Sequence, residues 1–171
     1  MTLSAASRGG DRAEDVKALA LSVGFDLAGI AKAEPKPETA LLREWLRRGF
    51  DAEMKYIERR VEERVDPREV LGDARSVIVV GFVYDPEAAP APRAASGSIS
   101  RYAGGDDYHD LLLERLQAVE AGLAPLAGRP VKTRSYVDTG PVQERMFAAY
   151  AGLGWIGRNT CDCWGSTVSS T

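Results

Sequence analysis

The sequence predicts an α/β domain, in which helices pack against the faces of a sheet. Amphipathic segments with helical periodicity alternate with short apolar segments of strand character along the chain. The 171 residues are the length of one ordinary domain. Hydrophobic residues make up 44% and charged residues 27%, and no apolar run approaches the ~20 residues of a membrane span. We therefore expect a soluble globular domain and exclude a disordered chain or a membrane protein.

The first half of the chain is expected to contain three helices and two strands. Residues 1–10 are small and polar and predict a flexible tail. The elements that follow are a helix at 11–22, a strand at 25–31, helices at 39–48 and 52–63, and a strand at 77–83. Asp11 and Glu14 resemble a capping box, and Gly24 is placed to end the first helix. The continuous apolar run at 77–83 predicts a central strand that is covered on both faces.

The second half is expected to alternate in the same way. Its segments are a long Pro- and Ala-rich loop at 85–98, a helix at 107–126, a strand at 132–137, and a helix from Pro141 to about Ala151. Proline is favoured in the first turn of a helix, which is why Pro141 is taken as its start.

Charge and cysteine content exclude several classes of function. The net charge of −3 argues against strong nucleic-acid binding by this chain alone. Cys161 and Cys163 are the only cysteines and lie too close together to staple a fold or complete a four-ligand metal site. His109 is the only histidine, so we assign no metal ligand. With no signal peptide at the start, the expected location is cytoplasmic.

Asp138 is the first candidate for chemistry. It follows the strand expected at 132–137 and precedes the helix expected at Pro141, and sites of α/β proteins gather at the carboxyl ends of strands. From spacing alone, an N-cap is the favoured interpretation, because Asp is among the best N-caps. A proton donor would need a carboxyl pKa raised by burial, whereas a capping carboxylate has a lowered one.

Two glycine-containing segments are further candidates. The segment from Arg101 to His109 contains two tyrosines, an arginine and the histidine on either side of two adjacent glycines. It is interpreted either as a ligand-binding turn or as a simple turn into a helix capped by Asp106 or Asp107. The segment 152–159 follows a helix rather than a strand, so it does not meet the context of a dinucleotide-binding fingerprint.

Taken together, these segments identify a family more specifically than any one of them does. In order and spacing they resemble the N-terminal domain of the epoxyqueuosine reductase family. The matching pieces are Glu53-Met54-x-Tyr56, Arg64-Val65-Asp66-Pro67, Ala74 to Val79, Arg101 to His109, Val137 to Arg145, and Ala151 to Thr160. The family reduces epoxyqueuosine to queuosine at the tRNA wobble position with cobalamin and two four-iron clusters. The resemblance implies a mixed sheet flanked by helices, similar to flavin nitroreductases, as a cobalamin-binding domain at residues 11–160.

The resemblance also implies roles for single residues. Asp138 matches the family's proton donor, which reverses the preference for a cap. The residues on segments that match the cobalamin pocket are Arg64, Tyr102, Asp107, Tyr108, His109, Arg158 and Asn159. Arg64 is the preferred cofactor contact among them.

The chain departs from the family after Thr160. Residues 161–171 are interpreted as a divergent, truncated tail, and the cysteine ligands of the iron–sulfur clusters are absent from the sequence. The resemblance implies a tRNA anticodon loop as partner of the full-length enzyme, and the missing ligands suggest a separate ferredoxin-like chain. A non-catalytic corrinoid-binding module, a subunit of a split enzyme and a small flavin nitroreductase-like enzyme remain alternatives.

Overall fold

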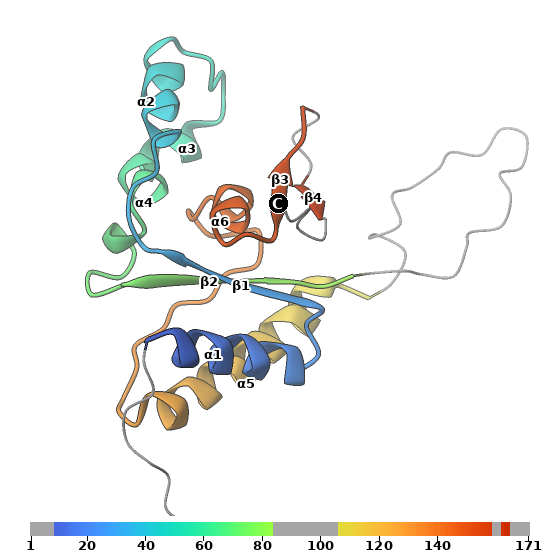
Figure 1. Cartoon of the computed structure of the whole chain (residues 1–171). Coiled ribbons are helices and arrows are strands. Elements are labelled where there is room, and N and C mark those ends of the chain that lie inside the picture. The colour runs from blue at the N-terminus through green and yellow to red at the C-terminus, as the bar shows by residue number, and fades with distance from the viewer. Residues whose placement is uncertain (1–8, 84–105, 159–161, 165–171) are drawn as a thin grey trace, which may run out of the picture.

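The computed structural model describes residues 9–83, 106–158 and 162–164, and within them the chain forms three layers (Figure 1). The middle layer is the sheet of β1 (Leu27–Lys32) and β2 (Ser76–Gly81). Helices α1 (Gly9–Ser22) and α5 (Tyr108–Ala127) cover one face, and α6 (Glu144–Tyr150) covers the other. The predicted α/β fold is confirmed.

The remaining elements lie at the ends of these layers. Between β1 and β2 the chain forms α2 (Thr39–Arg47), α3 (Lys55–Arg59), α4 (Val61–Val65) and the 3₁₀ helix η1 (Pro67–Glu69). After α6, β3 (Gly154–Ile156) pairs antiparallel with β4 (Asp162–Trp164). None of the helices in the described ranges is long and apolar enough to cross a membrane.

Strands β1 and β2 run antiparallel, with Leu27 opposite Gly81 and Lys32 opposite Ser76. Because side chains alternate along a strand, Ile78 packs towards α1 and α5, while Val77 packs towards α6. The expectation that this strand is covered on both faces is confirmed. The expectation that it is central is wrong for the described residues, where β2 pairs only with β1.

Two small cores separate the layers. Ala20 of α1 and Val119 and Leu123 of α5 are buried with Phe25 on one face of the sheet. On the other face, Ala31, Met146 and Phe147 are buried together, and Phe147 is only 1% exposed. Each helical layer is therefore anchored to the sheet by its own apolar cluster.

A glycine in β1 allows α6 to approach the sheet. A Cβ atom added to Gly29 would lie 2.8 Å from both the Cβ and the carbonyl oxygen of Ala151, the residue that ends α6. The carbonyl belongs to the backbone, so it cannot yield as a flexible side chain would. The absence of a side chain at Gly29 thus sets the distance between α6 and β1.

Several predicted elements differ in the structure. Residues 132–137 form no strand, because no neighbouring strand in the described ranges pairs with them. The helix predicted from Pro141 begins at Glu144, after a turn. The helix predicted at 52–63 is two short helices, α3 and α4. Helix α1 begins at Gly9, so Asp11 lies inside it and does not start it.

The loop predicted at 85–98 lies outside the described residues. The helices predicted at 39–48 and 107–126 are confirmed as α2 and α5. Helix α5 ends as such helices commonly do, with Gly128 in the left-handed conformation at φ 64°.

Substituting Gly29 tests the close approach of α6 to β1. Gly29→Ala should lower the free energy of unfolding by about 1–3 kcal/mol, because overpacking forces backbone shifts. Urea denaturation measures the change. Gly72→Ala is the matched control, since an added Cβ there meets no atom within 4 Å. Equal stability of the two variants would contradict the packing.

Candidate functional site

Asp138 lies at a turn between α5 and α6 and has a strained backbone. Its φ is 55°, in the left-handed region that aspartate tolerates better than most residues. Its side chain is 56% exposed. The Tyr108 hydroxyl donates a short hydrogen bond to Asp138 Oδ2, and His109 Nε2 lies 3.8 Å from the same oxygen. An exposed carboxylate is therefore held from one side by a phenol and an imidazole.

The start of α5 places both of these side chains. Asp107 is the N-cap of α5, and its carboxylate accepts a hydrogen bond of 2.9 Å from the His109 amide. The same oxygen lies 2.7 Å from His109 Nδ1, and the His109 ring stacks on Tyr108 at 4.2 Å. These bonds from the His109 amide and ring lower the pKa of Asp107. Asp107 thus orients the imidazole, whose Nε2 faces Asp138.

Glu144, the first residue of α6, contacts Asp138 from the other side. Glu144 Oε1 accepts a hydrogen bond of 3.1 Å from the Asp138 amide. Burial, followed by the negative charge of Asp138, raises the pKa of Glu144 to about 7. Glu144 was assigned no role from the sequence, although it lies in the Val137–Arg145 match. No sequence pattern marks it, because its burial arises only when α6 packs on the sheet.

Asp138 does not cap α6, so that interpretation is wrong. Gln143 is the N-cap residue of α6, and its side chain makes no capping bond. The turn between Asp138 and Gln143 depends on Gly140, where an added Cβ would overlap the Tyr136 ring. The carboxylate of Asp138 is consequently available to groups outside α6.

Arg64, the preferred cofactor contact, lies in α4 and is half-buried. Its guanidinium stands 5.9 Å from the Tyr56 ring, and its Nε is buried without a hydrogen-bond partner among the described residues. Its carbonyl accepts a hydrogen bond of 3.2 Å from Gln143 Nε2. Arg64 is therefore tied through its backbone to the turn that carries Asp138.

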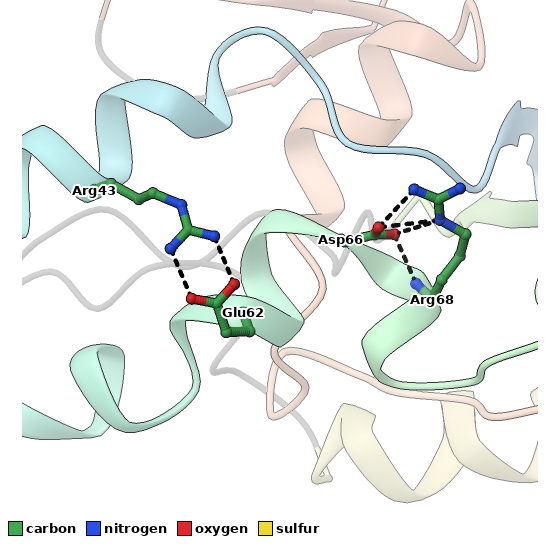
Figure 2. Close-up of polar contacts among 4 residues, drawn as sticks. All are labelled: Arg43, Glu62, Asp66 and Arg68. Atoms are coloured by element: carbon green, nitrogen blue, oxygen red, sulfur yellow. Dashed lines mark hydrogen bonds and ion pairs between the residues drawn. The ribbon is translucent and has the colours of Figure 1, made fainter.

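Figure 2 shows the ion pairs that fix the backbone on either side of Arg64. Arg43 of α2 binds both oxygens of Glu62 in α4, at 2.6 and 2.5 Å. Asp66 accepts bonds from both the guanidinium and the amide of Arg68, and this pairing lowers the pKa of Asp66. The bidentate geometry orders α4 although each pair lies near the surface.

The structure brings only part of the predicted site together. Asp107, Tyr108 and His109 gather with Asp138, as their sequence clustering suggested. Arg158 is exposed and is not brought to them by any bond among the described residues, and Tyr102 and Asn159 lie outside those residues. No group of three His, Cys, Asp or Glu side chains in the described ranges could hold a metal ion.

A groove of about 1730 Å³ reaches this cluster. It runs along β2 and is bounded on its other side by α5 and the irregular segment 129–138. Tyr108, Asp138 and Glu144 line it, whereas Arg64 and His109 do not. Both carboxyl groups of the pair are thus reached from this groove.

Comparison with known proteins gives one consistent relationship. The family model described as "Epoxyqueuosine reductase QueG, DUF1730" matches residues 64–139. A curated epoxyqueuosine reductase of Cellulophaga algicola is 38% identical over 146 residues, which are 85% of this chain and 47% of that protein. The chain spans about half the length of the curated relatives it matches.

Solved structures agree with this relationship. An epoxyqueuosine reductase bound to an epoxyqueuosine-modified tRNA-Tyr stem loop is 29% identical, with a TM-score of 0.75 over 87% of this chain and 40% of that one. An epoxyqueuosine reductase of Bacillus subtilis, solved with its catalytic aspartate loop swung out of the active site, is 27% identical, with a TM-score of 0.69. It covers 87% of this chain and 40% of that chain.

The raised pKa of Glu144 makes stability depend on pH. The folded state holds this proton up to about pH 7, whereas an unfolded glutamate loses it near 4.5. Stability should therefore fall by up to about 3 kcal/mol as pH rises through that window. Glu144→Gln should flatten this part of the profile in urea denaturation. An unchanged slope in the variant would show that another group carries the dependence.

Proposed function

Because the chain is homologous to the epoxyqueuosine reductases over about half of their length, we propose that it forms the cobalamin-binding, proton-donating part of such an enzyme. The single observation that supports this role is the setting of Asp138. An exposed carboxylate is held by Tyr108 and His109 beside a half-buried partner with a raised pKa, Glu144, at a position that matches the family's donor. The substrate would be epoxyqueuosine in a tRNA anticodon loop, and the compartment the cytosol.

The chemistry requires a proton donor at this point. Removing an epoxide oxygen as water takes two electrons and two protons. Asp138 would donate one of these protons to the departing oxygen and solvent water the other, and Tyr108 and His109 would orient the Asp138 carboxyl group during the transfer. Bound cobalamin would supply a reduced, nucleophilic cobalt centre. The electrons would come from iron–sulfur clusters carried by a separate ferredoxin-like chain or by other parts of the enzyme.

Arg64 supports the fit of a polar cofactor. A buried guanidinium N–H is costly to leave without an acceptor, and Nε of Arg64 has none among the described residues. The carboxamide or phosphate groups of cobalamin are acceptors of the required kind. We propose that Arg64 holds such a group, with Tyr102, Asp107, Tyr108, His109, Arg158 and Asn159 as further contacts.

The loop that carries Asp138 is proposed to take two positions. In the structure it lies against α5 through the bond from Tyr108. The related Bacillus subtilis protein has been solved with its catalytic aspartate loop swung out of the active site. We infer that the loop of this chain moves in the same way.

Cobalamin retention tests the role of Arg64. The 171-residue chain is incubated with cobalamin and desalted, and the retained corrin is read from its absorption spectrum. Arg64→Ala should weaken retention about tenfold or more, the usual effect of losing a charged hydrogen bond. Arg59→Ala removes an exposed arginine nearby and should leave retention unchanged. Equal retention by the two variants would make Arg64 a surface charge.

Epoxide reduction tests Asp138. The matching segment of the Cellulophaga algicola relative is replaced by this chain, so that the remaining half of that enzyme is present. Asp138→Asn in the chimera should lower turnover about 100-fold or more, the usual contribution of a general acid, with cobalamin binding intact.

The control for this experiment is Asp73→Asn, which changes a carboxylate that is 92% exposed. It should keep the activity of the parent chimera. Unchanged turnover in the Asp138 variant would refute its assignment as the donor. Retained cobalamin with no turnover in the parent chimera would instead favour a non-catalytic corrinoid-binding module.

A further inference from the structure

The Asp138 loop is attached at two points that belong to different helices. Its carboxylate bonds to Tyr108 and faces His109, both at the start of α5. Its amide donates to Glu144 at the start of α6. The second attachment acts directly on the residue whose backbone is left-handed, with φ 55°. Among the described residues, the other bond that supports this conformation is the one that the Thr139 amide donates to the Val137 carbonyl, across Asp138.

Glu144 holds the loop best in its neutral form, although the Asp138 amide taken alone bonds more strongly to an ionised carboxylate. A protonated Glu144 accepts the Asp138 amide with one oxygen and bonds the Asp138 carboxylate with its own proton. An ionised Glu144 places a second negative charge beside that carboxylate in a partly buried setting. Repulsion between like charges at such short range opposes the inward position of the loop.

Within residues 9–83 and 106–158, few other charges face this pair. Tyr108 and His109 approach from α5, and the imidazole faces the Asp138 carboxylate at 3.8 Å. Two effects lower the pKa of Glu144, namely the bond from the Asp138 amide and, least of all, the charge of His109. Burial and the charge of Asp138 outweigh both and raise the pKa. Arg145, the next residue of α6, is exposed and has an interaction of its own, and it is not among the groups that shift the pKa of Glu144. The balance between Glu144 and Asp138 is therefore set mainly by the two carboxyl groups themselves.

We propose that Glu144 is a positioning residue whose protonated carboxyl latches the Asp138 loop against α5, and whose ionisation releases the loop. This inference rests on the proposed function, since the loop position matters for catalysis only if Asp138 is the donor. It assigns Glu144 no contact with substrate. It makes the inward population of the loop fall as pH rises through neutrality.

The test follows the loop in the chain itself by NMR, without cofactor or RNA. The protection of the Asp138 amide against exchange is measured from about pH 6 to about pH 8, with the Glu144 carboxyl followed by its ¹³C shift. Protection should fall about tenfold as Glu144 ionises, which corresponds to about one pK unit of coupling. Glu144→Gln keeps an acceptor without a charge, so protection should persist at every pH. Glu144→Ala removes the acceptor and should abolish protection throughout.

The control is Glu120→Gln, which changes another carboxylate that holds the same stretch of chain by accepting a bond of 2.6 Å from Ser135. It should keep the parent's fall in protection. A fall that persists in Glu144→Gln, or constant protection while Glu144 ionises, would overturn the latch. The parent and Glu144→Gln decide the question even if Glu144→Ala does not fold. Failure here would leave the cobalamin and turnover results unaffected, so the two proposals fail separately.

Discussion

The packing of α6 on the sheet is the constraint on which the candidate site depends. This helix has seven residues, too few to be stable alone, so its position is set by what it contacts. Phe147 is buried against one face of the sheet, and Gly29 lets the helix end approach β1. The ammonium group of the buried Lys36 lies 4.6 Å from the centre of the Tyr150 ring, at the end of α6. A helix fixed in this way presents its first residue, Glu144, at one place only, directly beside the Asp138 amide.

The resulting carboxyl pair keeps a proton on Glu144 at a pH at which a single exposed carboxyl group would be ionised. Burying an ionised Glu144 beside Asp138 would cost folding free energy. The cost is smaller when one of the two carboxyl groups is neutral. Asp138 is open to a ligand, whereas Glu144 is behind it. Such pairs of unequally exposed carboxyl groups are common where proton transfer occurs, although they also occur in purely structural networks. In this chain, the adjacent phenol and imidazole favour the first interpretation.

Elements with strong periodicity could be predicted from the sequence, and those decided by distant contacts could not. Helices α2 and α5 were located to within a residue or two because their apolar residues recur at helical spacing. Residues 132–137 have strand composition, yet a strand also needs a partner, and none in the described ranges pairs there. Asp138 and Pro141 satisfy the local rules for a helix start, but packing places the first turn at Glu144.

The residues of the candidate site also divide into those that local sequence patterns identify and those that only distant contacts bring together. The neighbours Asp107, Tyr108 and His109 could be grouped because they are adjacent in the sequence, and the resemblance to a family joined them to Asp138. Glu144 could not be singled out, because a glutamate at the start of a helix is ordinary. Its distinguishing property, burial beside a second carboxylate, exists only in the folded chain.

The left-handed backbone of Asp138 also restricts how this position can change during evolution. Few side chains tolerate a φ of 55°, and asparagine and glycine are the most readily accommodated replacements. Both keep the turn while removing the carboxyl group. The substitutions that this position accepts most readily therefore keep the fold and remove the carboxyl group of Asp138. If Asp138 is the donor we propose, the residue at this turn will separate active from inactive homologues better than overall structural similarity does.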